Sequence, residues 1–366
     1  MEPDNITSTE DKPVGVDGVL RRVRMASLVI YCVIIMVGTL GNGLVVYVTG
    51  CRMKRTVNSV WFLNLALADF LFTAFLILTV ISTSQDFHWQ FGEFMCKLNS
   101  FVTIVNMFAS IFLLTAISLD RCLSIWVVVW AQNKRTVLKA QLICVCIWMT
   151  AMVCSTPYAF FRGINVRGEK IHCGYSASIT LKRLWIISIF RFVVGFLLPF
   201  LVIIVCYVAI AVRAGRLQRI RKQRSRRIIF SIVLAFFICW LPFHIINFIE
   251  LKSYDNPDLR NIVMIAGPLT LSLAFMNSCL NPILYVFLCD EFQKKLRKSI
   301  CFVLESALAE DHLSFMSSRS LSSHFSWISR KSDSTAPLER KGIETSLNFT
   351  ESKVVITGER QTVSTE

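Results

Sequence analysis

The chain has 366 residues, of which 54% are hydrophobic and 17% are charged, and its formal net charge is +15. Soluble globular proteins contain about 45–50% apolar and about 25% charged residues, so this composition excludes an ordinary soluble protein. Much of the positive charge lies beside apolar segments, where anionic lipid attracts it, and it therefore does not indicate nucleic-acid binding.

Residues 1–27 are predicted to form an extracellular N-terminal tail, because they are polar and mixed in charge. Asn5-Ile6-Thr7 is an acceptor sequence for N-linked glycosylation, which fits a segment outside the cell. The tail lacks the apolar run of a cleavable signal peptide.

Residues 28–288 are predicted to form a seven-transmembrane helix bundle, because a helix that crosses a bilayer needs about 20 mostly apolar residues. The expected spans are residues 28–50, 57–81, 97–119, 140–161, 184–212, 228–250 and 262–288. One set of connecting loops carries more Lys and Arg than the other, and the richer set is expected in the cytoplasm. The sequence thus predicts an all-α membrane protein whose N-terminus is outside.

Asp69 lies in the middle of the second span, where a carboxylate must be protonated, paired or bound to a cation. One carboxylate among several neutral oxygens favours a hard cation, and here we expect Na⁺. The predicted sodium ligands are Asp69, Asn106, Ser110, Asn277, Ser278 and Asn281. The alternative is a dry hydrogen-bond network around a protonated Asp69.

Two of the thirteen cysteines lie in segments expected on the outer side of the membrane. Cys96 lies at the outer start of the third span, and Cys173 lies in the loop between the fourth and fifth spans. Both are expected on the oxidising side of the membrane, so a disulfide between them is predicted. The cysteines show no spacing typical of a metal site.

Asp120 and Arg121 close the third span at its cytoplasmic end. Charged residues at the mouth of a membrane helix are costly and usually functional. We expect Arg121 to pair with Asp120 and to hold the inner ends of the helices together.

Arg191 lies in the outer half of the fifth span, eight residues before Pro199. A guanidinium at this depth is expected to face the bundle, where its planar fork suits a ligand carboxylate. Structural pairing, or extension of the side chain to the membrane surface, is the alternative.

Pro242 and Pro282 interrupt the helical hydrogen bonds of the sixth and seventh spans and predict hinges, with simple bends as the alternative. Trp240 and Phe236 lie one turn apart at the first of these kinks. The predicted activation switches are Asp120, Arg121, Tyr207, Phe236, Trp240, Pro242, Asn281, Pro282 and Tyr285.

Residues 289–304 are predicted to form an amphipathic helix on the cytoplasmic membrane surface, with Cys289 and Cys301 as candidates for palmitoylation. Residues 305–366 are rich in Ser and Thr and are expected to form a disordered cytoplasmic tail. Phosphorylation of this tail by receptor kinases would create sites for a basic partner such as arrestin.

Several motifs in order along residues 28–302 carry a family resemblance. They are Gly41-Asn42, Asn64 to Asp69, Cys96, Asp120-Arg121-Cys122, Trp148, Cys173, Pro199 with Tyr207, Cys239-Trp240-Leu241-Pro242 and Asn281-Pro282-Ile283-Leu284-Tyr285. Together they resemble rhodopsin-like (class A) G-protein-coupled receptors. His88-Trp89-Gln90-Phe91-Gly92 and Arg191-Phe192-Val193-Val194-Gly195-Phe196 further resemble the chemoattractant branch, and in particular formyl-peptide receptors and the chemerin receptor.

The chain departs from this branch at three informative positions. Ile104 and Ile187 stand where formyl-peptide receptors carry an acid and a second arginine, so Arg191 alone remains of that polar group. Val128 stands where the branch has a proline in the second cytoplasmic loop.

The resemblance implies a plasma-membrane receptor for a chemoattractant-like peptide or an acidic lipid mediator. It further implies signalling through an inhibitory-type G protein, with desensitisation by receptor kinases and arrestin. The expected ligand contacts are Trp89, Asn99, Thr103, Met107, Arg191, Phe243, His244 and Asn247. A non-signalling scavenger of chemoattractants is the alternative; a transporter or channel is disfavoured by seven spans without a repeat, and no nucleophile–base grouping indicates an enzyme.

Overall fold

The computed structural model describes residues 14–217 and 223–288 of the chain. Within them, seven helices are long and apolar enough to cross a membrane, which confirms the predicted seven-helix fold. The elements are α1 (Val14–Tyr47), η1 (Val48–Arg52), α2 (Val57–Ser84), α3 (Gly92–Trp126), α4 (Val128–Lys134), α5 (Val137–Phe160), β1 (Arg162–Arg167), β2 (Lys170–Tyr175), α6 (Leu181–Phe192), η2 (Val193–Leu197), α7 (Leu198–Leu217), α8 (Gln223–Lys252) and α9 (Asp258–Leu288). The π-helical turn η1 extends α1, and α6, η2 and α7 together form the fifth span.

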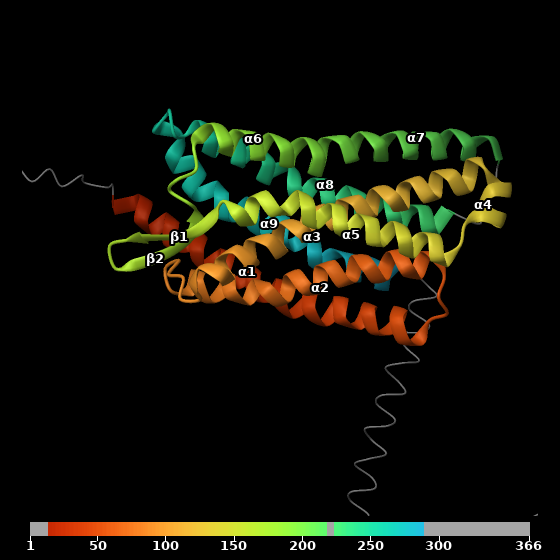
Figure 1. The fold of residues 1–366 in the computed structure, drawn as a ribbon, viewed down its shortest axis with the longest axis horizontal. Coiled ribbons are helices and arrows are strands. Elements are labelled where there is room, and N and C mark those ends of the chain that lie inside the picture. Colours follow the sequence, from red (N-terminus) through yellow and green to blue (C-terminus); the bar gives the residue numbers. More distant parts are fainter. Residues whose placement is uncertain (1–13, 218–222, 289–366) are drawn as a thin grey trace, which may run out of the picture. The chain divides into compact units, whose positions relative to one another are not determined.

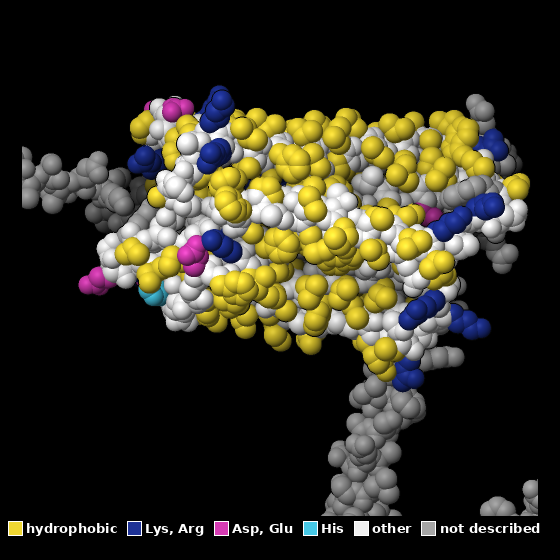
Figure 2. Space-filling view, in the orientation of Figure 1, with side chains coloured by type: hydrophobic (Ala, Val, Ile, Leu, Met, Phe, Trp, Pro, Cys, Tyr) yellow, Lys and Arg dark blue, Asp and Glu magenta, His cyan; other side chains and the backbone are white. Residues whose placement is uncertain are grey.

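The long helices run side by side, with the strands β1 and β2 at one end of the bundle and the short helix α4 at the other (Figure 1). We name these the hairpin end and the α4 end. Hydrophobic side chains cover the middle of the face seen in Figure 2, whereas Lys and Arg lie near its two ends. This distribution is that of a protein whose middle contacts lipid hydrocarbon.

Helix α1 begins at Val14, so the tail predicted over residues 1–27 is helical from Val14 onward. Leu20 and Val23, three residues apart, face a pocket that they share with α9. Arg24, one residue further on, forms an ion pair with Asp86 in the loop after α2. The helical periodicity is hidden in the sequence because arginines separate these apolar residues.

Threonine side chains cap three of the helices and explain where those helices begin. Thr56 accepts a hydrogen bond from the backbone nitrogen of Ser59, whose hydroxyl accepts one from the backbone nitrogen of Thr56, so α2 starts with a reciprocal capping box. Thr136 caps α5 and Thr180 caps α6 in the simpler one-bond form.

Helix α3 is the most deeply buried of the seven membrane-spanning helices, and residues such as Phe108 and Ile111 on it are fully buried. Small residues let neighbouring helices approach, as is usual in membranes, where packing rather than the hydrophobic effect joins helices. At Gly41 of α1, a Cβ atom would lie only 2.9 Å from Cγ of Pro282 on α9. The α1–α9 contact therefore depends on the absence of a side chain at Gly41.

The hairpin of β1 and β2 is fastened to the bundle at two places. Ile164 pairs with Cys173 across the hairpin, and Cys173 forms the predicted disulfide with Cys96 at the start of α3, which confirms that pairing. The loop before α3 adds two hydrogen bonds to Ile171. Its oxygen accepts from the backbone nitrogen of Trp89 at 2.7 Å, and its nitrogen donates to Nδ1 of His88 at 3.2 Å.

Several predictions lie outside the described residues and stay predictions. These are the glycosylation site Asn5, the amphipathic helix 289–304 with Cys289 and Cys301, and the tail 305–366.

Candidate functional site

Arg191 lies in the last turn of α6 with its side chain inside the bundle, and only 4% of the residue is exposed. Its Nη2 donates a hydrogen bond to Oδ1 of Asn247 on α8. Its Cζ lies 4.9 Å from the ring centre of Phe243 and 5.7 Å from that of Tyr158. The guanidinium is thus surrounded by a neutral amide and two aromatic faces, which attract a cation without neutralising it.

No carboxylate of the described residues forms an ion pair with Arg191, and its Nε has no hydrogen-bond partner. Glu250, further along α8, is near enough to interact electrostatically but makes no ion pair with it. Buried charges are normally paired, since an unpaired one is costly. Arg191 therefore has no anion in direct contact among the described residues, and Glu250 acts on it only at longer range.

His244 continues this group toward the centre of the bundle. The residue is buried, and its Nε2 has no hydrogen-bond partner among the described residues. Its ring lies 5.6 Å from that of Phe192, 5.7 Å from that of Phe243 and 6.4 Å from that of Trp240. His244 and its aromatic neighbours thus form a continuous path from the surroundings of Arg191 to Trp240.

The predicted contacts on α3 and in the loop before it make other interactions. Asn99 donates to Oγ1 of Thr79 at 3.3 Å, and the hydroxyl of Thr103 donates to the Asn99 carbonyl at 2.8 Å. Met107 is buried against η2, where its Cε would be 2.9 Å from a Cβ at Gly195.

Trp89 is buried in the loop before α3, and its Nε1 donates to the Gly92 carbonyl at 2.8 Å. With its backbone bond to Ile171, this geometry makes Trp89 a support of the hairpin. Of the eight predicted ligand contacts, the structure brings together Arg191, Phe243, His244 and Asn247 in one cluster.

Asp69 is fully buried at the centre of the bundle, among polar groups from α3 and α9. Asn281 donates to Asp69 Oδ2 at 2.6 Å, and Asn106 is linked to Ser278 at 3.0 Å and to Ser110 at 3.3 Å. When the Asn106 amide is rotated by half a turn, its nitrogen donates to Asp69 Oδ1 at 3.2 Å instead.

The residues around Asp69 fit a sodium ion chemically, because they offer a carboxylate with hydroxyl and amide oxygens. A buried oxygen nearby, Oδ1 of Asn42, has no hydrogen-bond partner, and the amide of Asn42 is fixed by a 2.8 Å bond to the Ser278 carbonyl. Asn277 is also buried on α9, but no hydrogen bond joins it to the other predicted ligands. The dry alternative also fits, since amide nitrogens donate to both carboxylate oxygens after the rotation.

Asp120, near the α4 end of α3, pairs chiefly with Arg135 rather than with Arg121. The Arg135 fork donates to both carboxylate oxygens, from Nε at 2.7 Å and from Nη2 at 2.9 Å, whereas Arg121 Nε lies 4.0 Å away. The expected Asp120–Arg121 pairing is therefore secondary. The physical reason is that a bidentate guanidinium contact is stronger than a single distant one.

Asn58 completes this group from the second residue of α2. Its Oδ1 accepts hydrogen bonds from Arg121 and, at 2.7 Å, from Arg135. Sequence reasoning missed both Asn58 and Arg135, and the only signal was the position of Arg135 immediately before the capping Thr136. The four side chains join α2, α3 and the segment before α5.

The remaining switch candidates lie along α7, α8 and α9. The Trp240 ring packs at a tilt against that of Phe236, with ring centres 5.9 Å apart, and its buried Nε1 has no partner among the described residues. The Tyr207 ring contacts that of Phe230 at 5.5 Å. Pro242 and Pro282 lie inside α8 and α9. Tyr285 lies in α9, but its side chain is outside the described residues.

Seven membrane-spanning helices, a hairpin bound to the third helix by a disulfide, and an unpaired buried cation beneath it define a seven-transmembrane receptor. The family model described as 7 transmembrane receptor (rhodopsin family) matches residues 41–285. The chain belongs to this family; it is therefore a multi-pass plasma-membrane receptor that binds an extracellular ligand and couples to a G protein, and not an enzyme.

Similar proteins include several chemoattractant receptors. Chemerin-like receptor 1 of Bos taurus is 40% identical over 86% of this chain and 94% of its own length. The C3a anaphylatoxin chemotactic receptor of Danio rerio is 40% identical over 79% of each chain. Formyl peptide receptor 2 of Mus musculus is 36% identical over 81% of this chain and 89% of its own.

Proposed function

We propose that the protein is a chemoattractant receptor whose agonist is an anionic peptide or lipid bound at the hairpin end. The observation that carries this proposal is Arg191, a buried guanidinium without an ion-pair partner among the described residues. A ligand carboxylate would supply the missing anion and form two parallel hydrogen bonds. The names of the similar chemerin, C3a and formyl-peptide receptors support an agonist of the chemoattractant type.

In this proposal the hairpin end faces the outside of the cell. The disulfide between Cys96 and Cys173 supports it, because disulfides persist in oxidising compartments. The excess of Lys and Arg in the loops of the α4 end supports it as well. The agonist then enters beside the hairpin, and Phe243 and Asn247 contact it together with Arg191.

Binding changes the balance between two conformations of the bundle. An anion on Arg191 weakens the hold of the guanidinium on Asn247 and Phe243 of α8, and His244 and Trp240 transmit the shift along that helix. Pro242 provides the hinge. The shift is limited by the difference in agonist affinity between the two conformations.

Asp69, with Asn106, Ser110, Ser278 and Asn281, would hold Na⁺ in the inactive conformation. The ion would supply positive charge to the buried carboxylate and link α2, α3 and α9. At the α4 end, Arg121 must leave Asn58 before it can contact a G protein, which by resemblance is of the inhibitory type. Receptor kinases and arrestin then act on the serine-rich tail.

The test is inhibition of cyclic AMP formation in cells that express the chain, challenged with chemoattractant peptides and acidic lipids, with and without pertussis toxin. A response that the toxin abolishes supports the proposal. Uptake of a ligand at the cell surface without any such response would favour a non-signalling scavenger. Val128, which replaces the proline of the branch in the second cytoplasmic loop, is the feature that supports this alternative.

A further inference from the structure

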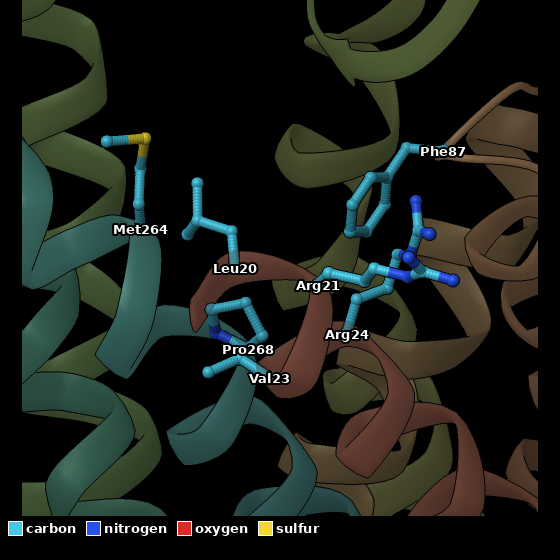
Figure 3. Close-up of a pocket in the computed structure, with 7 residues that line it drawn as sticks. All are labelled: Leu20, Arg21, Val23, Arg24, Phe87, Met264 and Pro268. Atoms are coloured by element: carbon cyan, nitrogen blue, oxygen red, sulfur yellow. The ribbon is translucent and has the colours of Figure 1, made fainter. Parts of the chain in front are cut away.

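A pocket lies at the hairpin end, between α1, α9 and the loop that joins α2 to α3 (Figure 3). Its volume is about 380 Å³, within the range of about 300–1,000 Å³ that is usual for small-molecule sites. None of the residues of the Arg191 cluster lines it. Its apolar walls are Leu20, Val23, Phe87, Met264 and Pro268.

Two arginines of α1 are the polar part of this lining. Arg24 is paired with Asp86, which Lys170 of β2 also approaches at 3.3 Å, and the buried Nε of Arg24 has no partner. Arg21 is exposed and forms no ion pair with any side chain that the structure describes. Asp86 thus already faces two cations, Arg24 and Lys170, and leaves the charge of Arg21 at the pocket unbalanced.

Phe87 is held at the pocket by an unusual backbone conformation. Asp86 and Phe87 have φ angles of 54° and 62°, and they are the only non-glycine residues with positive φ in residues 14–217 and 223–288. A bulky residue adopts this conformation only where its surroundings enforce it, and such residues gather at ligand clamps. Here the ion pairs of Asp86 with Arg24 and Lys170 hold the loop.

The side chains are arranged in two groups. In Figure 3, Arg21 and Arg24 extend toward the side of Phe87, whereas Leu20, Met264, Pro268 and Val23 lie on the other side. A molecule with an anionic head and an apolar chain matches this separation of charge from hydrocarbon surface. The pocket also lies at the ends of membrane spans, since α1 and α9 begin nearby, and thus adjoins the lipid head groups.

We propose that this pocket binds a single-chain lipid with a carboxylate or phosphate head, taken from the adjoining leaflet. The head contacts Arg21, and the chain lies along the apolar walls. An acidic peptide fits the pocket less well, because the lining side chains other than the two arginines offer no hydrogen-bonding groups for a peptide backbone. The site is separate from Arg191 and does not depend on the agonist proposed above.

The test uses the full chain in phosphatidylcholine nanodiscs and three photoreactive probes with the same chain: oleate, oleoyl lysophosphatidate and the neutral monoolein. We expect both anionic probes to label peptides containing residues 20–24 or 264–268. Arg21→Gln should reduce this labelling about tenfold, as expected for loss of a charge-assisted hydrogen bond. The matched control is Arg22→Gln, which removes the same charge from the adjacent exposed residue outside the lining.

Met264→Trp is the second variant, because it fills the pocket without changing the charge, and it should reduce labelling by all three probes. A stronger signal from oleate than from lysophosphatidate, or the reverse, identifies the head group. Equal labelling by monoolein and the anionic probes would overturn the proposal. An equal loss of labelling in the Arg21→Gln and Arg22→Gln variants would also overturn it, as would full labelling of the Met264→Trp variant. The same holds if an acidic peptide displaces the probes and unlabelled oleate does not.

Discussion

Arg191 has weak partners for a buried guanidinium: the amide of Asn247 and the rings of Phe243 and Tyr158. If an agonist anion completes the site, Arg191→Ala removes a buried hydrogen-bonded charge pair, which costs about 2 kcal/mol or more, or roughly 30-fold in affinity. We therefore expect agonist potency to fall by at least that factor while surface expression stays normal. Dose–response curves for cyclic AMP inhibition measure the change.

The matched control for Arg191 is Arg183→Ala, since Arg183 lies on the same helix but is exposed. The agonist should be as potent on the Arg183→Ala variant as on the unchanged receptor. Arg191→Lys tests the geometry, because an ammonium keeps the charge but lacks the planar fork, so its potency should lie between those of the parent and Arg191→Ala. Unchanged potency of Arg191→Ala would remove Arg191 from the ligand site.

A substitution of Asp69 can distinguish a bound sodium ion at this site from a hydrogen-bond network without an ion. If Na⁺ binds Asp69 only in the inactive conformation, replacing sodium with choline should raise agonist affinity, since a ligand stabilises the state that it binds. Asp69→Asn keeps the size of the side chain but removes the charge, and should abolish this sodium dependence. Agonist binding at constant ionic strength is the measurement. A parent receptor that is indifferent to sodium would instead favour the dry network.

At the scale of helices, Gly41 fixes how closely α1 approaches the kinked α9. A Cβ there would lie 2.9 Å from Cγ and 3.0 Å from Cβ of Pro282, and a proline ring cannot rotate away. Gly41→Ala should therefore lower stability by about 1–3 kcal/mol, as for an overpacked core. Thermal unfolding of the purified receptor in nanodiscs should show a lower midpoint.

Gly267 of α9 provides the control for Gly41, because no atom lies within 4 Å of a Cβ built there. Gly267→Ala should be neutral or should raise stability by roughly 0.5–1 kcal/mol, the usual gain of alanine over glycine inside a helix. An equal loss of stability in both variants would show that the approach to Pro282 is not the cause.

The seven membrane-spanning helices could be predicted from the sequence, because a run of about 20 apolar residues has few alternatives to a membrane span. The start of α1 was not predictable in the same way. Its first turns contain Arg21, Arg22 and Arg24, a charge cluster typical of the boundary of a span. In the structure Arg24 pairs with Asp86, and Arg21 lines a pocket together with Phe87 and residues of α9. Such contacts join residues far apart in the chain and leave no local pattern.

Within the candidate site, sequence reasoning found the buried ionisable residues, because a charge inside a membrane is conspicuous. It identified Asp69 and Arg191 but did not single out their hydrogen-bond partners, because several polar residues were candidates. The structure pairs Asp69 with Asn281 and Arg191 with Asn247. Trp89 carried no sign that it supports the hairpin through Ile171.

At the scale of the whole molecule, Arg191 lies on α6 and Asp120 lies in the last turns of α3, which are followed by α4. Helix α6 is near the hairpin end of the bundle and α4 is at the opposite end (Figure 1). If the agonist binds at the Arg191 cluster as proposed, its binding competes with the hydrogen bonds at the other end. Arg135 contributes three of these bonds, two to Asp120 and one to Asn58. If the described arrangement is the inactive conformation, Arg135 makes most of the side-chain hydrogen bonds that stabilise it within this cluster.

Arg135→Gln should accordingly raise basal signalling. Loss of charge-assisted hydrogen bonds worth about 1.5 kcal/mol would increase the ratio of active to inactive receptor roughly tenfold without agonist. Basal cyclic AMP inhibition at matched surface expression measures this ratio. Lys134→Gln is the control, because it removes a positive charge from the adjacent exposed residue, which forms no ion pair among the described residues. If both variants raised basal signalling equally, the cause would be the general charge of this loop; if only Arg135→Gln did so, the contact with Asp120 and Asn58 restrains the receptor.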